Sequence, residues 1–381
     1  MILIVQEMCA RIGLVTGSGL AAVIKKKYPR KVVLTIASLI IIANTINIGA
    51  DIGAMAASIK LLIPQFPVII STLSFTALII VSEILVPYSK YVKILKYLSI
   101  SLFAYLATAI IVGGNTEQIL FASIIPHIET TPAFEMIFVA IFGATMTPYA
   151  FFWQASEEAE EDVNKDKIME ISSLVSKPLR ISKKEINLMR SDVAIGMALS
   201  QLVMWAIITT TATTLHANGV STIQTADQAA RALEPLVKTF PSSGEISKTI
   251  FAMGVIGTGL LAIPVLAGAS GYALSDVFGW KEGLSKSLRQ AKNFYLVIAA
   301  STIIGLWINF TNIDPIKALV YSAIINGIVA VPILIAVMKI ANDREILKDK
   351  VNSRLSNIIG LVVIVIMGIS IVLMLLTWKN R

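Results

Sequence analysis

The stretch GATMTPYAFFWQ, residues 143–154, interrupts an apolar run that is otherwise long enough to form a membrane helix. Pro148 lies near the middle of this run and follows Gly143, Thr145 and Thr147. Because proline donates no backbone hydrogen bond and clashes with the preceding turn, we expect the helix to break here. In a bilayer, the carbonyls freed by a break are tolerated only beside protein or a water-filled cavity. The stretch therefore predicts either an ordinary proline kink or a binding site, and the residues alone leave both interpretations open.

The composition is that of a membrane protein. Of the 381 residues, 56% are hydrophobic and only 15% are charged, whereas roughly 25% of a soluble domain is charged. Because apolar stretches of about 20 residues recur along the whole chain, we expect an all-α polytopic membrane protein. A large soluble core would place its charges along helix faces, but here they gather between the apolar runs.

We recognise ten apolar segments and assign the whole chain, residues 1–381, to a single transmembrane domain. Each segment is expected to be a helix. The segments are residues 1–23, 33–62, 67–87, 96–113, 133–154, 192–216, 248–274, 293–310, 316–340 and 356–377.

The connections between these segments alternate in charge, which predicts the orientation of the chain. By the positive-inside rule, the connections rich in Lys and Arg lie in the cytoplasm of a multi-pass protein of the cell membrane. The net charge of +8 is then explained by membrane topology, and no nucleic-acid partner is expected. The predicted cytoplasmic loops are residues 24–32, 88–96, 155–191, 279–292 and 341–355.

This orientation places Met1 outside the membrane, with Glu7 and Arg11 following early in the first segment. Their i, i+4 spacing predicts an ion pair inside the helix bundle. The simplest interpretation of the topology is that the chain starts partway down a helix and that at least one helix precedes Met1.

Several polar groups inside the apolar segments are candidate ligands. Asn44, Asn47 and Asp51 share one face of a helix by their i, i+3 and i+7 spacing, and either line a pathway or bond to neighbouring helices. Asn326 has the same two interpretations. Glu83 is expected to pair or to reach the membrane surface. If the break is a site, its oxygen donors come from Gly143, Ala144, Thr145, Thr147, Tyr149 and Gln154.

Three stretches are similar to one known family. MCARIGLVTGSGLAAVIKKKYPR, residues 8–30, resembles the second helix and following loop of the Nramp divalent-metal transporters. FGATMTPYAFFWQAS, residues 142–156, resembles the sixth helix of that family, and NDREILKD, residues 342–349, resembles a later loop. The resemblance implies a LeuT-like bundle of two inverted repeats, with metal bound between broken helices one and six. The Asp-Pro-Gly motif of helix one has no counterpart in this sequence.

The resemblance also implies a ligand set. The family's carbonyl ligand falls at Ala144, its methionine at Thr147, and its helix-ten ligand region close to Ala323–Asn326. We therefore take Ala144, Thr147 and Asn326 as the expected metal ligands. The other positions near the site or its pathway are Gly143, Thr145, Pro148, Tyr149, Gln154, Asn44, Asn47 and Asp51.

The missing thioether decides the expected ion. Thioethers suit softer ions, whereas hydroxyl and amide oxygens suit hard ones such as Mg²⁺. The pattern resembles the Nramp-related magnesium transporter branch. We expect a secondary transporter working by alternating access, with Mg²⁺ favoured over Mn²⁺ and the bilayer as its surroundings. We expect no enzymatic activity and no resident cofactor, and we take a monomer as the working oligomeric state.

Three alternatives stay open at this point. The chain is a proton-coupled Mn²⁺/Fe²⁺ importer with Asp51 in the proton path, or it is a truncated remnant that does not transport. The third is a carrier of another substrate class, such as an amino acid, whose carboxylate would be bound at the helix start formed by residues 148–151.

Overall fold

The structure, a computed structural model, describes residues 1–86, 97, 100–112, 116–125, 128–129, 131–164, 168, 179–220, 222–223, 225–238, 242–311 and 313–379. Over these residues the regular structure is entirely helical. The main helices are α1 (Ile2–Thr16), α2 (Leu20–Lys27), α3 (Arg30–Leu62), α4 (Val68–Leu85), α6 (Phe103–Val112), α7 (Thr116–Ile124), α8 (Pro132–Thr145), α9 (Pro148–Asn164), α10 (Lys183–Thr214), α11 (Ala226–Ala230), α12 (Ser243–Phe278), α13 (Lys292–Ile308), α14 (Pro315–Ala341), α15 (Arg344–Leu347) and α16 (Arg354–Lys379).

Helices occupy each of the ten apolar ranges, and their lengths suit a membrane. Within the described residues, seven helices are long and apolar enough to cross a bilayer, and the bent pair α1 and α2 makes an eighth candidate. Two further apolar helices, α6 and α13, are shorter. α8 and α9 together form one of the long candidates, Pro132–Val163. The number of true spans stays a prediction.

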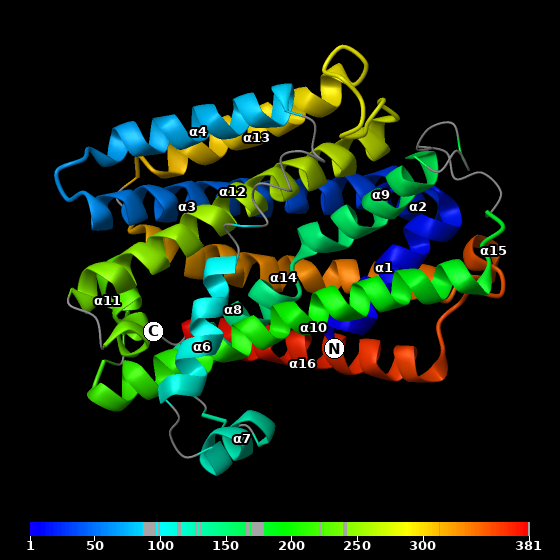
Figure 1. Ribbon diagram of the computed structural model, residues 1–381. Coiled ribbons are helices and arrows are strands. Elements are labelled where there is room, and N and C mark those ends of the chain that lie inside the picture. The colour runs from blue at the N-terminus through cyan, green and yellow to red at the C-terminus, as the bar shows by residue number, and fades with distance from the viewer. Residues whose placement is uncertain are drawn as a thin grey trace.

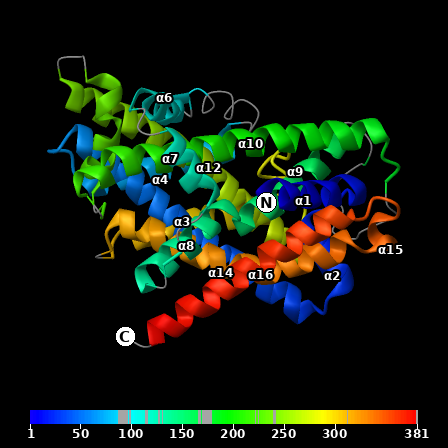
Figure 2. The same ribbon diagram turned by 90° about the horizontal axis from the view of Figure 1, so that it is seen from below.

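The helices form two groups that meet at α3 (Figure 1). α3, α4, α12 and α13 pack together as one group, and α1, α8, α9, α10, α14 and α16 form the other. α3 contacts α12 and α13 on one side and α14 on the other, while α9 contacts both α1 and α12. In the view from below, α16 runs beside α14 at one side of the bundle (Figure 2). α8 and α9, which carry the predicted break, therefore lie where the two groups adjoin.

The first apolar segment is not the single helix expected over residues 1–23. α1 and α2 meet at an angle of 80° around Gly17–Gly19. Gly17 adopts φ 60°, a left-handed conformation that glycine takes without steric cost, and it ends α1. The side chain of Lys25 on α2 donates a hydrogen bond of 2.8 Å to the Val277 carbonyl near the end of α12. The bend thus lays α2 across the neighbouring helix.

Local signals set the ends of α10 and α14. Ser182 and Glu185 form a capping box at the start of α10, and Asp314 caps α14 ahead of Pro315. Because α9 continues to Asn164 and α10 begins at Lys183, much of the loop predicted over 155–191 is helix. The predicted loop 88–96 lies outside the described residues, as do 165–167 and 169–178.

The connection between the segments 192–216 and 248–274 contains a short helical stretch made of α11 and the 3-10 helix Arg231–Val237. It packs through Ala232 and Leu233 into a small apolar cluster with α6 and α10. Elsewhere the outer surface is apolar. Large hydrophobic side chains are exposed along α4 and α16, among them Ile69, Leu73, Leu361 and Ile369. Such a surface suits lipid contact.

Candidate metal site at the broken helix

The break in the helix is confirmed at the position expected from Pro148. α8 ends at Thr145, α9 begins at Pro148, and Met146 and Thr147 connect them. Met146 still donates a hydrogen bond of 2.7 Å to the Phe142 carbonyl. Pro148 has no amide hydrogen, so the Ala144 carbonyl loses the partner that a continuous helix would supply. This freed carbonyl is the kind of oxygen that can bind a cation.

Thr147, Tyr149 and Asp51 lie near one another. Thr147 is only 7% exposed. Tyr149, half-buried on α9, has its hydroxyl beside Thr147 and within electrostatic range of Asp51 on α3. Asp51 is also half-buried. The fold thus brings the break and the acidic position of α3 together, although they are about a hundred residues apart in the sequence.

Asn326 lies beside the close crossing of α8 and α14. A Cβ atom built at Gly143 would stand 1.8 Å from the Ala323 carbonyl oxygen and 2.5 Å from the Gly327 nitrogen. Only glycine allows the two backbones to approach this closely. Asn326 is 1% exposed, and its Oδ1 accepts no hydrogen bond within the described part of the chain. A buried amide oxygen without a partner is costly, and a bound cation would satisfy it.

Asn44 and Asn47 take the second of their two interpretations, bonding between helices. Asn44 Nδ2 donates 3.0 Å hydrogen bonds to the Leu266 carbonyl and to Ser270 Oγ, both on α12. Asn47 Oδ1 accepts a 2.8 Å hydrogen bond from Ser322 Oγ on α14. The shared face of α3 therefore divides between two neighbouring helices, and these asparagines hold α3 in place.

The remaining predicted positions do not converge on the break. The Thr145 hydroxyl donates back to the Ile141 carbonyl of its own helix, and the Ala144 side chain is exposed. Gln154 donates a 3.3 Å hydrogen bond to Glu158, one turn further along α9 and away from the break. Over the described residues, no group of three or more His, Cys, Asp or Glu side chains could hold a metal ion. Asp51 is the carboxylate that the fold brings near the break, and the other predicted donors there are neutral oxygens.

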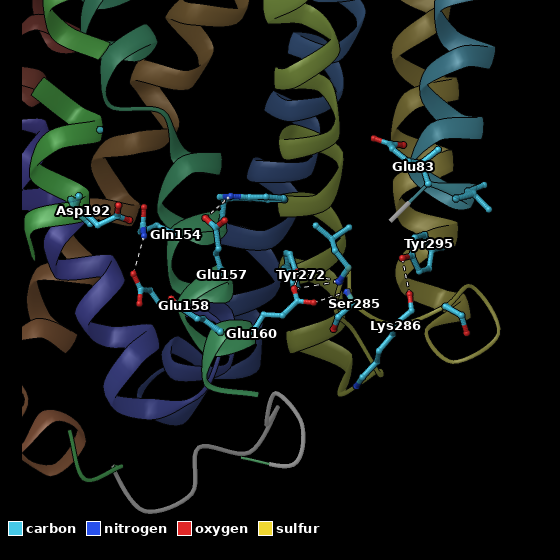
Figure 3. A pocket seen from close by; sticks show the side chains of 18 of the residues that line it. Glu83, Gln154, Glu157, Glu158, Glu160, Asp192, Tyr272, Ser285, Lys286 and Tyr295 are labelled. Carbon is cyan, nitrogen blue, oxygen red and sulfur yellow. Dashed lines mark hydrogen bonds between the residues drawn. The ribbon is translucent and has the colours of Figure 1, made fainter. Parts of the chain in front are cut away.

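A large acidic cavity that was not predicted from the sequence lies further along α9. It has a volume of about 840 Å³ and lies between α4, α9, α10 and the segment ahead of α13 (Figure 3). Of the predicted site residues, only Gln154 lines it. The run SEEAEED, residues 156–162, falls in the predicted cytoplasmic loop 155–191. The closely spaced carboxylates of this run were the signal in the sequence that could have predicted the acidic cavity.

Glu160 joins α9 to the segment that follows α12. The Tyr272 hydroxyl donates a hydrogen bond to its carboxylate, and the Leu284 and Ser285 amides donate bonds of 3.3 Å and 2.6 Å (Figure 3). Close by, outside the membrane helices, Glu282 is buried, and this burial together with Asp276 raises its pKa well above the usual value.

The predicted pair of Glu7 and Arg11 is confirmed, with 3.1 Å between Glu7 Oε1 and Arg11 Nε. Arg190 on α10 lies 2.9 Å from the same carboxylate oxygen. Arg11, 2% exposed, also donates to the Lys350 carbonyl and to Asn352 Oδ1. This network ties α1 to α10 and to the connection before α16. The carboxylate oxygens of Glu83, by contrast, accept no hydrogen bond from the described residues, so the first of its two interpretations, pairing, is not observed there.

The chain has the features of a polytopic membrane protein of the transporter class. These are long apolar helices, an apolar outer surface and a broken helix at the junction of two helix groups. A family model described as natural resistance-associated macrophage protein-like matches residues 1–377, and the chain belongs to this Nramp family of divalent metal transporters. The family consists of transporters rather than enzymes.

Individual relatives agree with the family. The chain is 26% identical over 381 residues to the divalent metal cation transporter MntH of Klebsiella pneumoniae (strain 342), covering 96% of this chain and 81% of the relative. It is 25% identical over 383 residues to MntH of Yersinia enterocolitica, covering 97% and 83%. A crystal structure of the Eremococcus coleocola manganese transporter superposes with a TM-score of 0.69 at 16% identity, covering 98% of this chain and 77% of that one. The expected LeuT-like transporter fold is confirmed by this likeness.

Proposed function

We propose that this chain carries a divalent metal cation across the membrane by alternating access, with the ion bound at the broken helix. The proposal is supported by the break between α8 and α9, which leaves the Ala144 carbonyl without its helical partner next to the buried Thr147, and by the unpartnered Asn326 oxygen on α14, a helix that packs against α8. Broken helices at mid-membrane commonly supply ion ligands in transporters.

Two lines of support bear on the ion. A similar solved structure is named as a manganese transporter, and curated relatives are named as divalent metal cation transporters, which makes Mn²⁺ the first candidate. Mg²⁺ is the second candidate, and its support is the donor set alone. Oxygen ligands without a thioether suit Mg²⁺, Ca²⁺ and Mn²⁺ and disfavour soft ions such as Cd²⁺. Both candidates predict a carrier that prefers hard divalent ions.

The test is uptake of Mn²⁺ into proteoliposomes containing the purified chain, with Mg²⁺ and Cd²⁺ as competitors. We expect excess Mg²⁺ to compete and Cd²⁺ to compete poorly. The Thr147→Met variant introduces a second thioether at the break, beside Met146, whose side chain packs in the apolar core, and it should improve competition by Cd²⁺ about tenfold relative to Mg²⁺. Thr249→Met on α12 is the matched control, because Thr249 is exposed and its hydroxyl bonds only to its own helix.

Absence of Mn²⁺ uptake, or equal Cd²⁺ competition in wild type and Thr147→Met, would overturn this proposal.

Proton coupling is a separate question. Asp51, within electrostatic range of the Tyr149 hydroxyl, is the candidate proton carrier of the importer alternative. Acidification of the vesicle lumen during Mn²⁺ uptake, lost in Asp51→Asn, would support coupling.

The predicted orientation puts the connections rich in Lys and Arg in the cytoplasm, and cysteine labelling from each side of the membrane tests this orientation.

A further inference from the structure

The acidic cavity carries much more negative than positive charge. Among the residues that the structure describes, its walls include one cationic side chain, Lys286, and six carboxylates: Glu83, Glu157, Glu158, Glu160, Glu161 and Asp192. In Figure 3, Asp192 on α10 and Glu83 on α4 lie on opposite sides, with the α9 carboxylates between them. Like charges gathered in one partly enclosed space repel one another, so the cavity favours cations.

Glu83 is the part of the cavity that internal contacts leave unexplained. Both its carboxylate oxygens are buried, and neither accepts a hydrogen bond from any residue that the structure describes. Figure 3 shows the carboxylate turned from α4 toward the cavity. An ionised carboxylate removed from water is expensive unless a cation or proton accompanies it. The Glu83 carboxylate is therefore a group that could bind a cation in the cavity.

The other carboxylates differ in how fully they are used. Glu160 is engaged by Tyr272 and two backbone amides, so it holds the cavity wall together. Glu157 accepts one hydrogen bond from the Trp153 indole nitrogen, at 3.0 Å, and Glu158 accepts one from Gln154. Asp192 on α10 lies within electrostatic range of both glutamates. Glu158, Asp192 and Glu83 thus offer charge from three different helices.

We propose that this cavity binds one divalent cation with its water shell retained, held by the charges of Glu83, Glu158 and Asp192, at a site separate from the broken helix. Water is retained because no three carboxylates of the described chain come close enough to coordinate a metal directly. Ions such as Mg²⁺ dehydrate reluctantly and often keep several waters. Monovalent cations bind more weakly there because they feel half the attraction.

The cavity lies along α9, the helix that begins at the break. Gln154, which lines the cavity, is on α9, the helix that begins directly after Thr147, and it bonds to Glu158. An ion leaving the break along α9 would therefore reach the cavity next. This inference relies on the proposed function only for the choice of ion, since binding to the cavity is measured without transport.

The experiment counts bound Mn²⁺ by electron paramagnetic resonance on the purified full chain in detergent. The triple variant Glu83→Gln, Glu158→Gln, Asp192→Asn should lose one class of bound Mn²⁺. In water, a carboxylate about 7 Å from a doubly charged ion strengthens binding about twofold to threefold after screening, so the loss of three carboxylates should weaken binding about tenfold. Asp349→Asn, an exposed site outside the cavity, is the control and should bind as wild type.

A second readout locates the ion. Trp153 lines the cavity, so cavity-bound Mn²⁺ should quench its fluorescence, and Trp153→Phe should remove that part of the quenching. If the triple variant does not fold, Glu83→Gln alone should still weaken this class about twofold to threefold. Unchanged Mn²⁺ number, affinity and quenching in a folded cavity variant would overturn the inference. Loss of the cavity class with unaltered ion selectivity of uptake in Thr147→Met would instead sink the proposed function alone.

Discussion

Replacing Gly143 with alanine tests whether the crossing of α8 and α14 positions the ion site. The added Cβ would be 1.8 Å from the Ala323 carbonyl oxygen, where ordinary contact begins near 3.4 Å. Both the carbonyl oxygen and the Gly327 nitrogen, at 2.5 Å, are backbone atoms, so neither can rotate away. The two helices must therefore separate locally by about 1.6 Å, the shortfall between those two distances.

The energetic consequence divides between stability and transport. Alanine gains about 1 kcal/mol over glycine inside a helix, whereas overpacking costs about 1–3 kcal/mol, so we expect a net loss of about 1 kcal/mol. Transport should suffer more, because a displacement of about 1 Å at a reacting centre can cost on the order of a hundredfold in rate. We expect Mn²⁺ uptake by Gly143→Ala to fall at least about tenfold.

The assay compares initial Mn²⁺ uptake in proteoliposomes with the melting temperature of the same protein in detergent. Gly368→Ala on α16 is the matched control, since no atom lies within 4 Å of its added Cβ. That variant should keep wild-type uptake and melt at the same temperature or slightly higher. If Gly143→Ala behaves like Gly368→Ala in both measurements, the close crossing does not position the site and the reasoning is refuted.

Three further predictions concern the contacts that hold the helices. Arg11→Met should lower the free energy of unfolding by about 3 kcal/mol, because it leaves the buried Glu7 with one arginine fewer, and adding Glu7→Gln should recover part of this in a denaturation cycle; strict additivity would contradict the pairing. Asn44→Leu should cost about 1–3 kcal/mol, seen as a lower melting temperature without a change in ion selectivity. Burial opposes ionisation of Asp343, but hydrogen bonds from Lys27 and the Glu345 amide dominate and lower the pKa of Asp343. Its contribution to stability is thus present above the unfolded pKa of about 4 and is lost as pH falls through the lower folded value, and melting curves of Asp343→Asn should lack this acid-induced loss.

Local rules predicted the parts of the fold that depend on neighbours in the sequence. Hydropathy located the helices, because lipid selects long apolar stretches. Pro148 located the break, since the missing amide is a property of one residue. The i, i+4 spacing predicted the ion pair of Glu7 and Arg11, which the structure confirms. The glycines of the run TGSG, residues 16–19, indicate a bend, but the apolar residues on both sides led to the prediction of one continuous helix.

Long-range contacts could not be predicted in this way. Whether Asn44 lines a pathway or bonds to a neighbour depends on Leu266, which is 222 positions away. The same holds for Glu160 and Ser285, separated by 125 positions. The acidic run on α9 was predicted only as part of the cytoplasmic loop 155–191, because nothing in its own sequence places Glu83 across the cavity from it. The chemistry of a single residue can be read from the sequence. Whether its polar groups find a partner depends on how the helices pack.

On these two proposals, the break and the cavity divide the handling of a doubly charged ion between two kinds of oxygen. Carbonyl, hydroxyl and amide groups such as those of Ala144, Thr147 and Asn326 replace water around an ion but offset little of its charge, so they hold it weakly. Carboxylates at the same depth would bind it far more strongly, because electrostatic attraction grows in a less polar environment. A carrier must also release its ion. With neutral donors at the break and carboxylates further along α9, the ion would move from a weak site toward a region of more negative potential. Water retained around the ion at the second site would keep binding there weak enough for release.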